Sequence, residues 1–169
     1  MTIILIIFLL TGLASGFVAG LLGVGGGIII VPVTYFILLK LGYGSEVVMH
    51  VAVASSLSVI LFTSISSIRS HVKFKNTNLN IVKKWALGIV LGSIFGSLSA
   101  SFISGENLVI IFVVLAFMIS MNMLFQQKPI IINTDLPSSK TVNLLISSLI
   151  GFFSAIIGIG GGSFSVPTL

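Results

Sequence analysis

The residues of this chain best suited to chemistry are glycines, which form two short runs inside apolar sequence. The first run is Gly25, Gly26 and Gly27, and Pro32 follows it. Each glycine disfavours a helix by about 1 kcal/mol relative to alanine, and proline has no backbone N–H group. The run therefore predicts a helix break, with the helix resuming near Ile28. The free N–H groups and positive dipole of such a helix start attract anions.

The second run is Gly160, Gly161 and Gly162, and Pro167 follows it in the same way. The hydroxyl group of Ser163 could cap the resumed helix or contact a ligand there. The alternative for both runs is that the glycines only allow close packing or a tight turn. Neither run is a phosphate-binding P-loop, because no Lys-Ser or Lys-Thr pair follows the glycines.

Hydroxyl groups are the other candidate ligands for an anion, because every ionisable Asp, Glu, Lys and Arg lies in a predicted loop. The candidates on the apolar run 47–67 are Ser55, Ser56, Ser58, Thr63 and Ser64. The alternative is that these hydroxyls bond back to carbonyls of their own helix. The chain has no cysteine, and we find no histidine–carboxylate pair at metal spacing and no Ser-His-Asp set. We therefore predict no enzyme activity, no metal site and no cofactor.

The composition indicates that bilayer, not water, surrounds these residues. Hydrophobic residues make up 56% of the chain and charged residues 7%, whereas a typical soluble domain has about 25% charged residues. The mean hydropathy is +1.28. The net charge of +5 does not indicate nucleic-acid binding, because the basic residues lie between apolar runs.

The apolar runs predict an all-α, polytopic transmembrane helical bundle, because lipid requires every backbone polar group to bond internally. They cover residues 3–39, 47–67, 85–103, 108–125 and 142–169. Residues 3–39 are too long for one straight span of about 20 residues. One crossing there places the N-terminus inside the cell, and two crossings place it outside.

The loops 69–84 and 126–140 hold seven of the eight Lys and Arg residues. The positive-inside rule predicts that both loops are cytoplasmic in a multi-pass protein of the cell (inner) membrane. Trp85 follows the first loop, and we expect it to anchor the helix at that membrane interface.

The chain contains an internal repeat. Residues 151–169 repeat residues 16–34, and eight of the 19 aligned positions are identical. We therefore predict a first transmembrane repeat unit at 1–135 and the start of a second, incomplete unit at 136–169. Four crossings per unit make the repeats parallel, and five make them inverted. Small residues at four-residue spacing predict close helix packing at Gly12, Gly16 and Gly20 and at Gly88, Gly92 and Gly96.

The segment GLLGVGGGIIIVP, followed by AVASSLSVILFTSISS, His71 and a basic stretch, resembles the sulfite exporter TauE/SafE family. The resemblance covers essentially the whole chain, and the duplicated glycine–proline block is its most specific part. It implies a permease with two related halves that moves small anions such as sulfite or organosulfonates. Its implied partners are the lipid bilayer, the anion, and a missing second half or further copies. The alternative is a truncated, non-transporting membrane protein or assembly partner.

Overall fold

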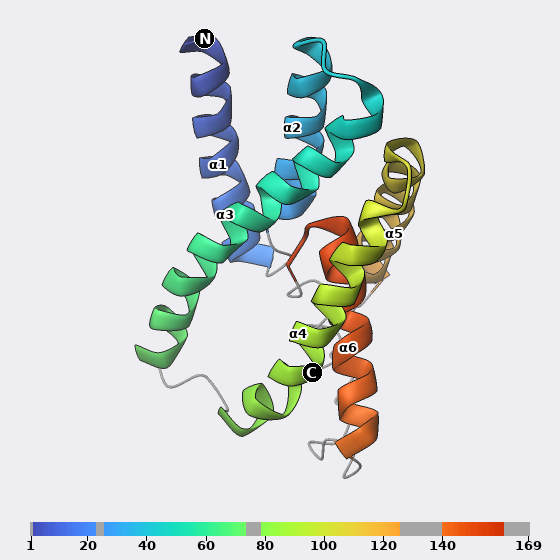
Figure 1. The fold of residues 1–169 in the computed structure, drawn as a ribbon. Helices are drawn as coiled ribbons and strands as arrows, with labels where there is room; N and C mark the ends of the chain where they lie inside the picture. Colours follow the sequence, from blue (N-terminus) through green and yellow to red (C-terminus); the bar gives the residue numbers. More distant parts are fainter. Residues whose placement is uncertain (1, 23–25, 74–78, 126–139, 161–169) are drawn as a thin grey trace.

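The computed structural model of the chain is helical over nearly all of the residues it describes, which are 2–22, 26–73, 79–125 and 140–160 (Figure 1). These residues contain no strand, which confirms the all-α prediction. The six helices are α1 (Thr2–Leu22), α2 (Gly27–Lys40), α3 (Ser45–Lys73), α4 (Leu79–Ser101), α5 (Gly105–Phe125) and α6 (Lys140–Ile157).

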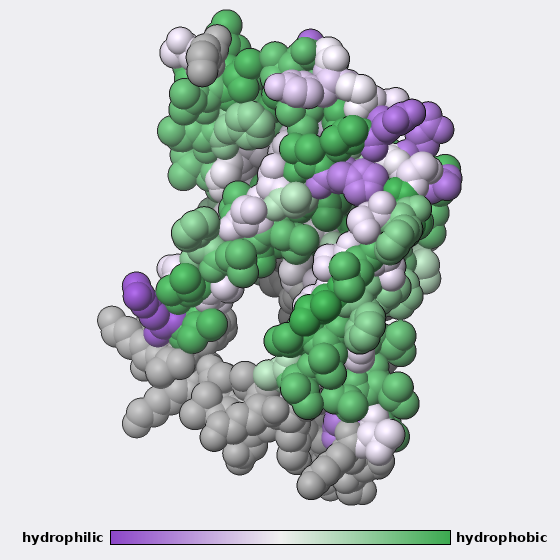
Figure 2. Space-filling model, in the orientation of Figure 1, coloured by the Kyte–Doolittle hydropathy of each residue, from purple (hydrophilic) through white to green (hydrophobic). Residues whose placement is uncertain are grey.

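The helices are apolar on their outer surfaces as well as in their packed core. α1 and α3 are long and apolar enough to cross a membrane, and the other four helices contain shorter apolar stretches. Figure 2 shows hydrophobic atoms over most of one face, with small hydrophilic patches near the ends of the helices. Large exposed apolar side chains are stable against lipid and unstable in water. The surface therefore agrees with a membrane bundle.

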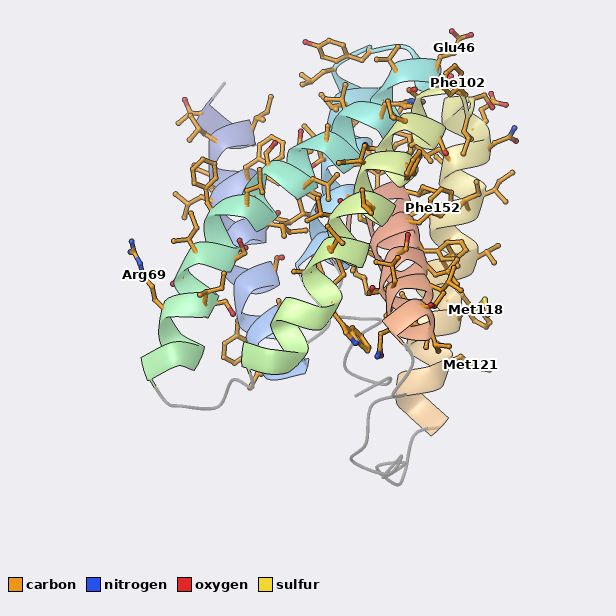
Figure 3. The ribbon with its side chains drawn as sticks, turned by 60° about the horizontal axis from the view of Figure 1, so that its bottom comes forward. Glu46, Arg69, Phe102, Met118, Met121 and Phe152 are labelled. Carbon is orange, nitrogen blue, oxygen red and sulfur yellow. The ribbon has the colours of Figure 1, made fainter. Side chains whose placement is uncertain are left out.

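Ionisable side chains lie at the ends of helices, and the prediction that they lie in loops is wrong for several of them. Lys40 ends α2, and Glu46 and Glu106 lie in the first turns of α3 and α5. Glu46 and Arg69 lie toward opposite ends of α3 (Figure 3). A carboxylate is stabilised by the positive end of the helix dipole, and a long basic side chain can reach polar surroundings from a helix end. The helices therefore extend beyond the apolar runs that predicted them.

The first apolar run turns back on itself. In Figure 1, α1 runs downward from the N-terminus and α2 runs upward, so the N-terminus and the α2–α3 connection lie at one end. α6, the repeat counterpart of α1, runs in the opposite direction from α1. Of the two arrangements that the sequence allowed, the helix directions match the inverted one.

Glycines make the closest helix pair, α4 with α6. A side chain at Gly88, Gly92 or Gly96 would overlap residues of α6, so the packing prediction for this stripe is confirmed. The structure does not show the same packing for Gly12, Gly16 and Gly20, because no described residue lies within 4 Å of a Cβ built at any of them.

Trp85 is buried rather than placed at an interface, with 6% of its surface exposed. It lies three residues before Gly88 on α4, and residues at this spacing share a helix face. Trp85 therefore lies on the face of α4 that packs against α6, and its Nε1–H has no hydrogen-bond partner within the described part of the chain. The prediction of an interfacial anchor at Trp85 is wrong.

Candidate functional site

The break between α1 and α2 falls at the predicted glycine run. α1 ends at Leu22, and α2 begins at Gly27 with Gly26, which has no capping side chain, as its N-cap. The hydroxyl group of Ser15, on α1, donates a 2.9 Å hydrogen bond to the carbonyl oxygen of Gly26. Ser15 is only 1% exposed. This bond ties α1 to the start of α2 across the break.

The second break follows α6 and depends on left-handed backbone conformations. α6 ends at Ile157, and Gly158 and Gly160 then have φ angles of 73° and 65°. A residue with a Cβ is strained in this region, and glycine is not. A Cβ at Gly158 would also meet Val53 of α3, and one at Gly160 would meet Ile60 of α3. The glycines therefore allow the chain both to turn and to approach α3.

The two breaks are in direct contact, although they belong to different repeat units. A Cβ at Gly27 would overlap the carbonyl oxygen of Gly158 and the Cα of Ile159. Figure 1 shows the start of α2 and the end of α6 meeting in the central part of the bundle. Non-helical backbone at membrane depth is tolerated where protein or a wet cavity surrounds it. This contact supplies protein on one side of each break.

Ser56 connects α3 to this contact. Its hydroxyl group donates a 2.6 Å hydrogen bond to the carbonyl oxygen of Gly158, and the side chain is completely buried. Back-bonding within the helix is therefore the wrong alternative for Ser56. It is the correct one for Ser58, Thr63 and Ser64, whose hydroxyls bond to carbonyls three or four residues earlier.

Five predicted site residues lie within the part of the chain that the structure describes. Gly27 and Ser56 take part in the contact, Gly26 bonds to Ser15 next to it, and Gly160 lies beside it against α3. Ser55 is half-buried next to Ser56 on α3. The other predicted site residues lie outside the described residues; they are Gly25, Gly161, Gly162 and Ser163.

Sequence reasoning did not select Ser15 or Gly158 as site residues. Gly158 carried a signal, because it aligns with Gly23 in the repeat and begins the second glycine block. Ser15 carried none, because its repeat counterpart is Ile150 and a lone serine on an apolar helix is common. Only the fold places its hydroxyl group against the break.

The polar groups of the site favour an anion over a cation. The carbonyl oxygens of Gly26 and Gly158 already accept hydrogen bonds from Ser15 and Ser56. The N-cap residue of α2, Gly26, has no side chain that could cap the first turn, and that end of the helix carries the positive pole of its dipole. Lys40, the only Lys, Arg, Asp or Glu residue of α2, lies at its other end. Backbone N–H groups therefore dominate the start of α2.

The described residues 2–22, 26–73, 79–125 and 140–160 contain no group of three His, Cys, Asp or Glu side chains that could hold a metal ion. His50 makes a contact between two helices instead. Its Nε2 atom lies 3.1 Å from the carbonyl oxygen of Ala100 and links α3 to the end of α4.

Comparison with known proteins confirms the family resemblance seen in the sequence. The family described as "Sulfite exporter TauE/SafE" matches residues 8–169. The chain belongs to this family. The match covers both glycine blocks and all six helices, except the first residues of α1.

Three TauE/SafE relatives are named as probable membrane transporter proteins. The YunE protein of Bacillus subtilis is 29% identical over 97% of this chain and 66% of its own length. A protein of Haemophilus influenzae is 32% identical over 98% of this chain and 62% of its own length. A protein of Methanocaldococcus jannaschii is 32% identical over 99% of this chain and 62% of its own length.

This TauE/SafE chain therefore spans somewhat less than two thirds of the length of the curated relatives it matches. No solved structure gives a significant match to it.

Proposed function

We propose that this protein forms part or all of a permease that passes small anions, such as sulfite or organosulfonates, across the cell membrane. The observation that carries the proposal is the contact between Gly27 and Gly158. It brings the helix breaks of two repeat units together, and transporters built from inverted repeats commonly bind substrate between broken helices at the repeat interface.

The charge preference follows from the hydrogen bonds at the contact. Ser15 and Ser56 donate to two carbonyl oxygens of the breaks. The N-cap residue of α2 is a glycine without a capping side chain, so the N–H groups of Gly27 and Ile28, which precede those bonded to the Gly26 carbonyl, are the candidate anion donors. A sulfite or sulfonate group presents several oxygen atoms that accept hydrogen bonds from such N–H groups. The half-buried hydroxyl group of Ser55 is a further candidate donor.

The proposed location is the inner membrane, with the loops 69–84 and 126–140 on the cytoplasmic side. The C-terminal end of α3 and the N-terminal ends of α4 and α6 lie at one end of the molecule (Figure 1). The positive-inside rule assigns such a basic end to the cytoplasm. The proposed partners are the bilayer, the anion, and a further repeat unit or further copies of the chain. Membrane transport leaves no role for an enzyme activity.

A second candidate function is that of a non-transporting assembly partner. The relevant observation is that the chain spans 62% to 66% of the length of its relatives. This alternative differs from the first in one measurable way, because it predicts that the chain alone moves no anion.

The test is flux of radiolabelled sulfite and taurine into vesicles that contain the purified chain. We expect flux by the wild type and little flux by Gly26→Leu, because a side chain at Gly26 would meet the Ser15 hydroxyl group. Flux by the wild type and Gly26→Leu at equal rates would refute the role of the break. No flux by either protein would support the assembly partner.

A further inference from the structure

Most of α1 is exposed in the structure, and one of its exposed faces carries the small residues of a helix contact. Among the described residues, no atom lies within 4 Å of a Cβ built at Gly12, Gly16 or Gly20. Leu13 and Phe17, between these glycines, are 65% and 70% exposed. We call these five residues the α1 glycine face.

Lipid alone is a poor explanation for three glycines on this face. Each glycine weakens the helix by about 1 kcal/mol relative to alanine, and small side chains at membrane depth usually mark a place where another helix approaches. Ser15, on the other side of α1, is already used in the contact with Gly26. The α1 glycine face therefore lies on a side of α1 that the contact with α2 does not use.

The internal repeat shows what such a face contacts. α6 is the repeat counterpart of α1, with Gly151 aligned with Gly16 and Phe152 aligned with Phe17. Gly151 packs on the backbone of Ile89 of α4, and Phe152 packs on Gly96 of α4.

Two further counterparts make the same contact. By the same alignment, Ser147 and Ser148 of α6 are the counterparts of Gly12 and Leu13. Ser147 lies against Gly88 of α4, and the backbone of Ser148 lies so close to Gly92 that a Cβ there would overlap it. The face of α6 that packs on α4 is thus the same face that α1 leaves open.

We propose that the α1 glycine face docks a transmembrane helix like α4, with small residues at four-residue spacing, from a second repeat unit. The first helix of the second unit, α6, packs on α4 of the first unit. A two-fold relation between the units requires the reciprocal contact, in which α1 packs on the fourth long helix of the second unit. This inference depends on the repeat geometry and not on which substrate the protein moves.

The α4 sequence itself provides the probe for this surface. The chain has no cysteine, so a Leu41→Cys variant of the full chain takes one fluorescent donor at an exposed site beyond α2. A synthetic peptide of residues 79–101 carries the acceptor, and both are placed in the same vesicles. We expect energy transfer that saturates as the peptide fraction rises.

Two variants of the donor-labelled chain locate the contact. Gly16→Leu should weaken peptide association by about fivefold or more, because close approach of the backbones is lost. Ala14→Leu is the matched control, because its counterpart Leu149 is already a large side chain and is 56% exposed on α6. A Cβ at Gly16 has no described residue within 4 Å and Ala14 is exposed, and circular dichroism verifies that both variants keep their helices.

A third comparison uses a peptide with leucine at the positions of Gly88, Gly92 and Gly96, which should not associate. Equal association by the Gly16→Leu and Ala14→Leu chains would overturn the proposal. Association of the triple-leucine peptide as strong as that of the native peptide would overturn it too, as would an absence of saturable transfer to the unaltered chain.

Discussion

The hydroxyl group of Ser56 lies 2.6 Å from the carbonyl oxygen of Gly158 and joins α3 to the break that follows α6. The two residues are 102 positions apart in the sequence. The bond satisfies a backbone carbonyl that the end of a helix would otherwise leave unpaired in a buried setting. Ser15 and Gly26 form the comparable bond at the other break, so each glycine break in the described residues is held by one buried serine.

Ser56→Ala should destabilise the protein by about 1–2 kcal/mol, because the Gly158 carbonyl loses its buried donor. Thermal unfolding in detergent measures this loss. Ser58→Ala is the matched control on the same helix, because the Ser58 hydroxyl is exposed and bonds only to the carbonyl of Ala54. An equal loss in both variants would contradict a specific role for the Ser56 bond.

Gly27→Ala should push the two breaks apart, because the new methyl group would overlap the backbone of Gly158 and Ile159. Overpacking of this kind costs about 1–3 kcal/mol. We expect a lower unfolding temperature together with reduced sulfite flux in vesicles. Gly44→Ala is the control, because a Cβ at Gly44 has nothing within 4 Å. Unchanged flux by Gly27→Ala would show that the Gly27–Gly158 contact has no part in transport.

Comparing Gly158→Ala with Gly42→Ala distinguishes the effect of backbone strain from an effect on transport. Gly158 and Gly42 both have positive φ angles, 73° and 85°, and alanine in this conformation costs about 1–2 kcal/mol. Gly158→Ala and Gly42→Ala should therefore both lower the unfolding temperature. Only Gly158→Ala should reduce flux per folded molecule, because Gly42 lies in the α2–α3 connection. Equal flux defects in the two variants would assign the effect to strain alone.

Gly92→Leu should disrupt the pairing of α4 with α6, because the side chain would overlap the backbone of Ser148. We expect loss of folded protein or a destabilisation at the upper end of about 1–3 kcal/mol. Ser97→Leu is the control on the same helix, because Ser97 is exposed and its hydroxyl bonds only within α4. Size-exclusion profiles and unfolding curves in detergent measure both. A Gly92→Leu protein as stable as Ser97→Leu would contradict the packing.

The helices and the glycine break at Gly26 and Gly27 could be predicted from the sequence, because composition and intrinsic helix preference are local properties. The partner of Ser56 could not, because a bond across 102 residues depends on the tertiary arrangement. The burial of Trp85 was missed for the same reason. The residues next to Trp85 in the sequence indicate a membrane interface. Its burial depends instead on packing between helices that are far apart along the chain.

The repeat also shows what a sequence pattern leaves open. Gly16 and Gly151 are identical residues in aligned segments, and the pattern predicts close packing for both. Gly151 packs on Ile89, whereas a Cβ at Gly16 meets nothing. The pattern identifies a surface able to pack, and the presence of a partner decides whether it does.

The most direct test of the account is whether an anion occupies the start of α2. Ile28 is half-buried in the first turn of that helix, and Ile28→Cys gives a single thiol in a chain without cysteine. The measurement is the rate at which a thiol reagent labels this cysteine in the presence of methanesulfonate or of its neutral analogue, dimethyl sulfone. The account predicts that methanesulfonate slows labelling in a saturable manner and that dimethyl sulfone does not. Equal labelling rates with both compounds would contradict an anion site at the glycine break.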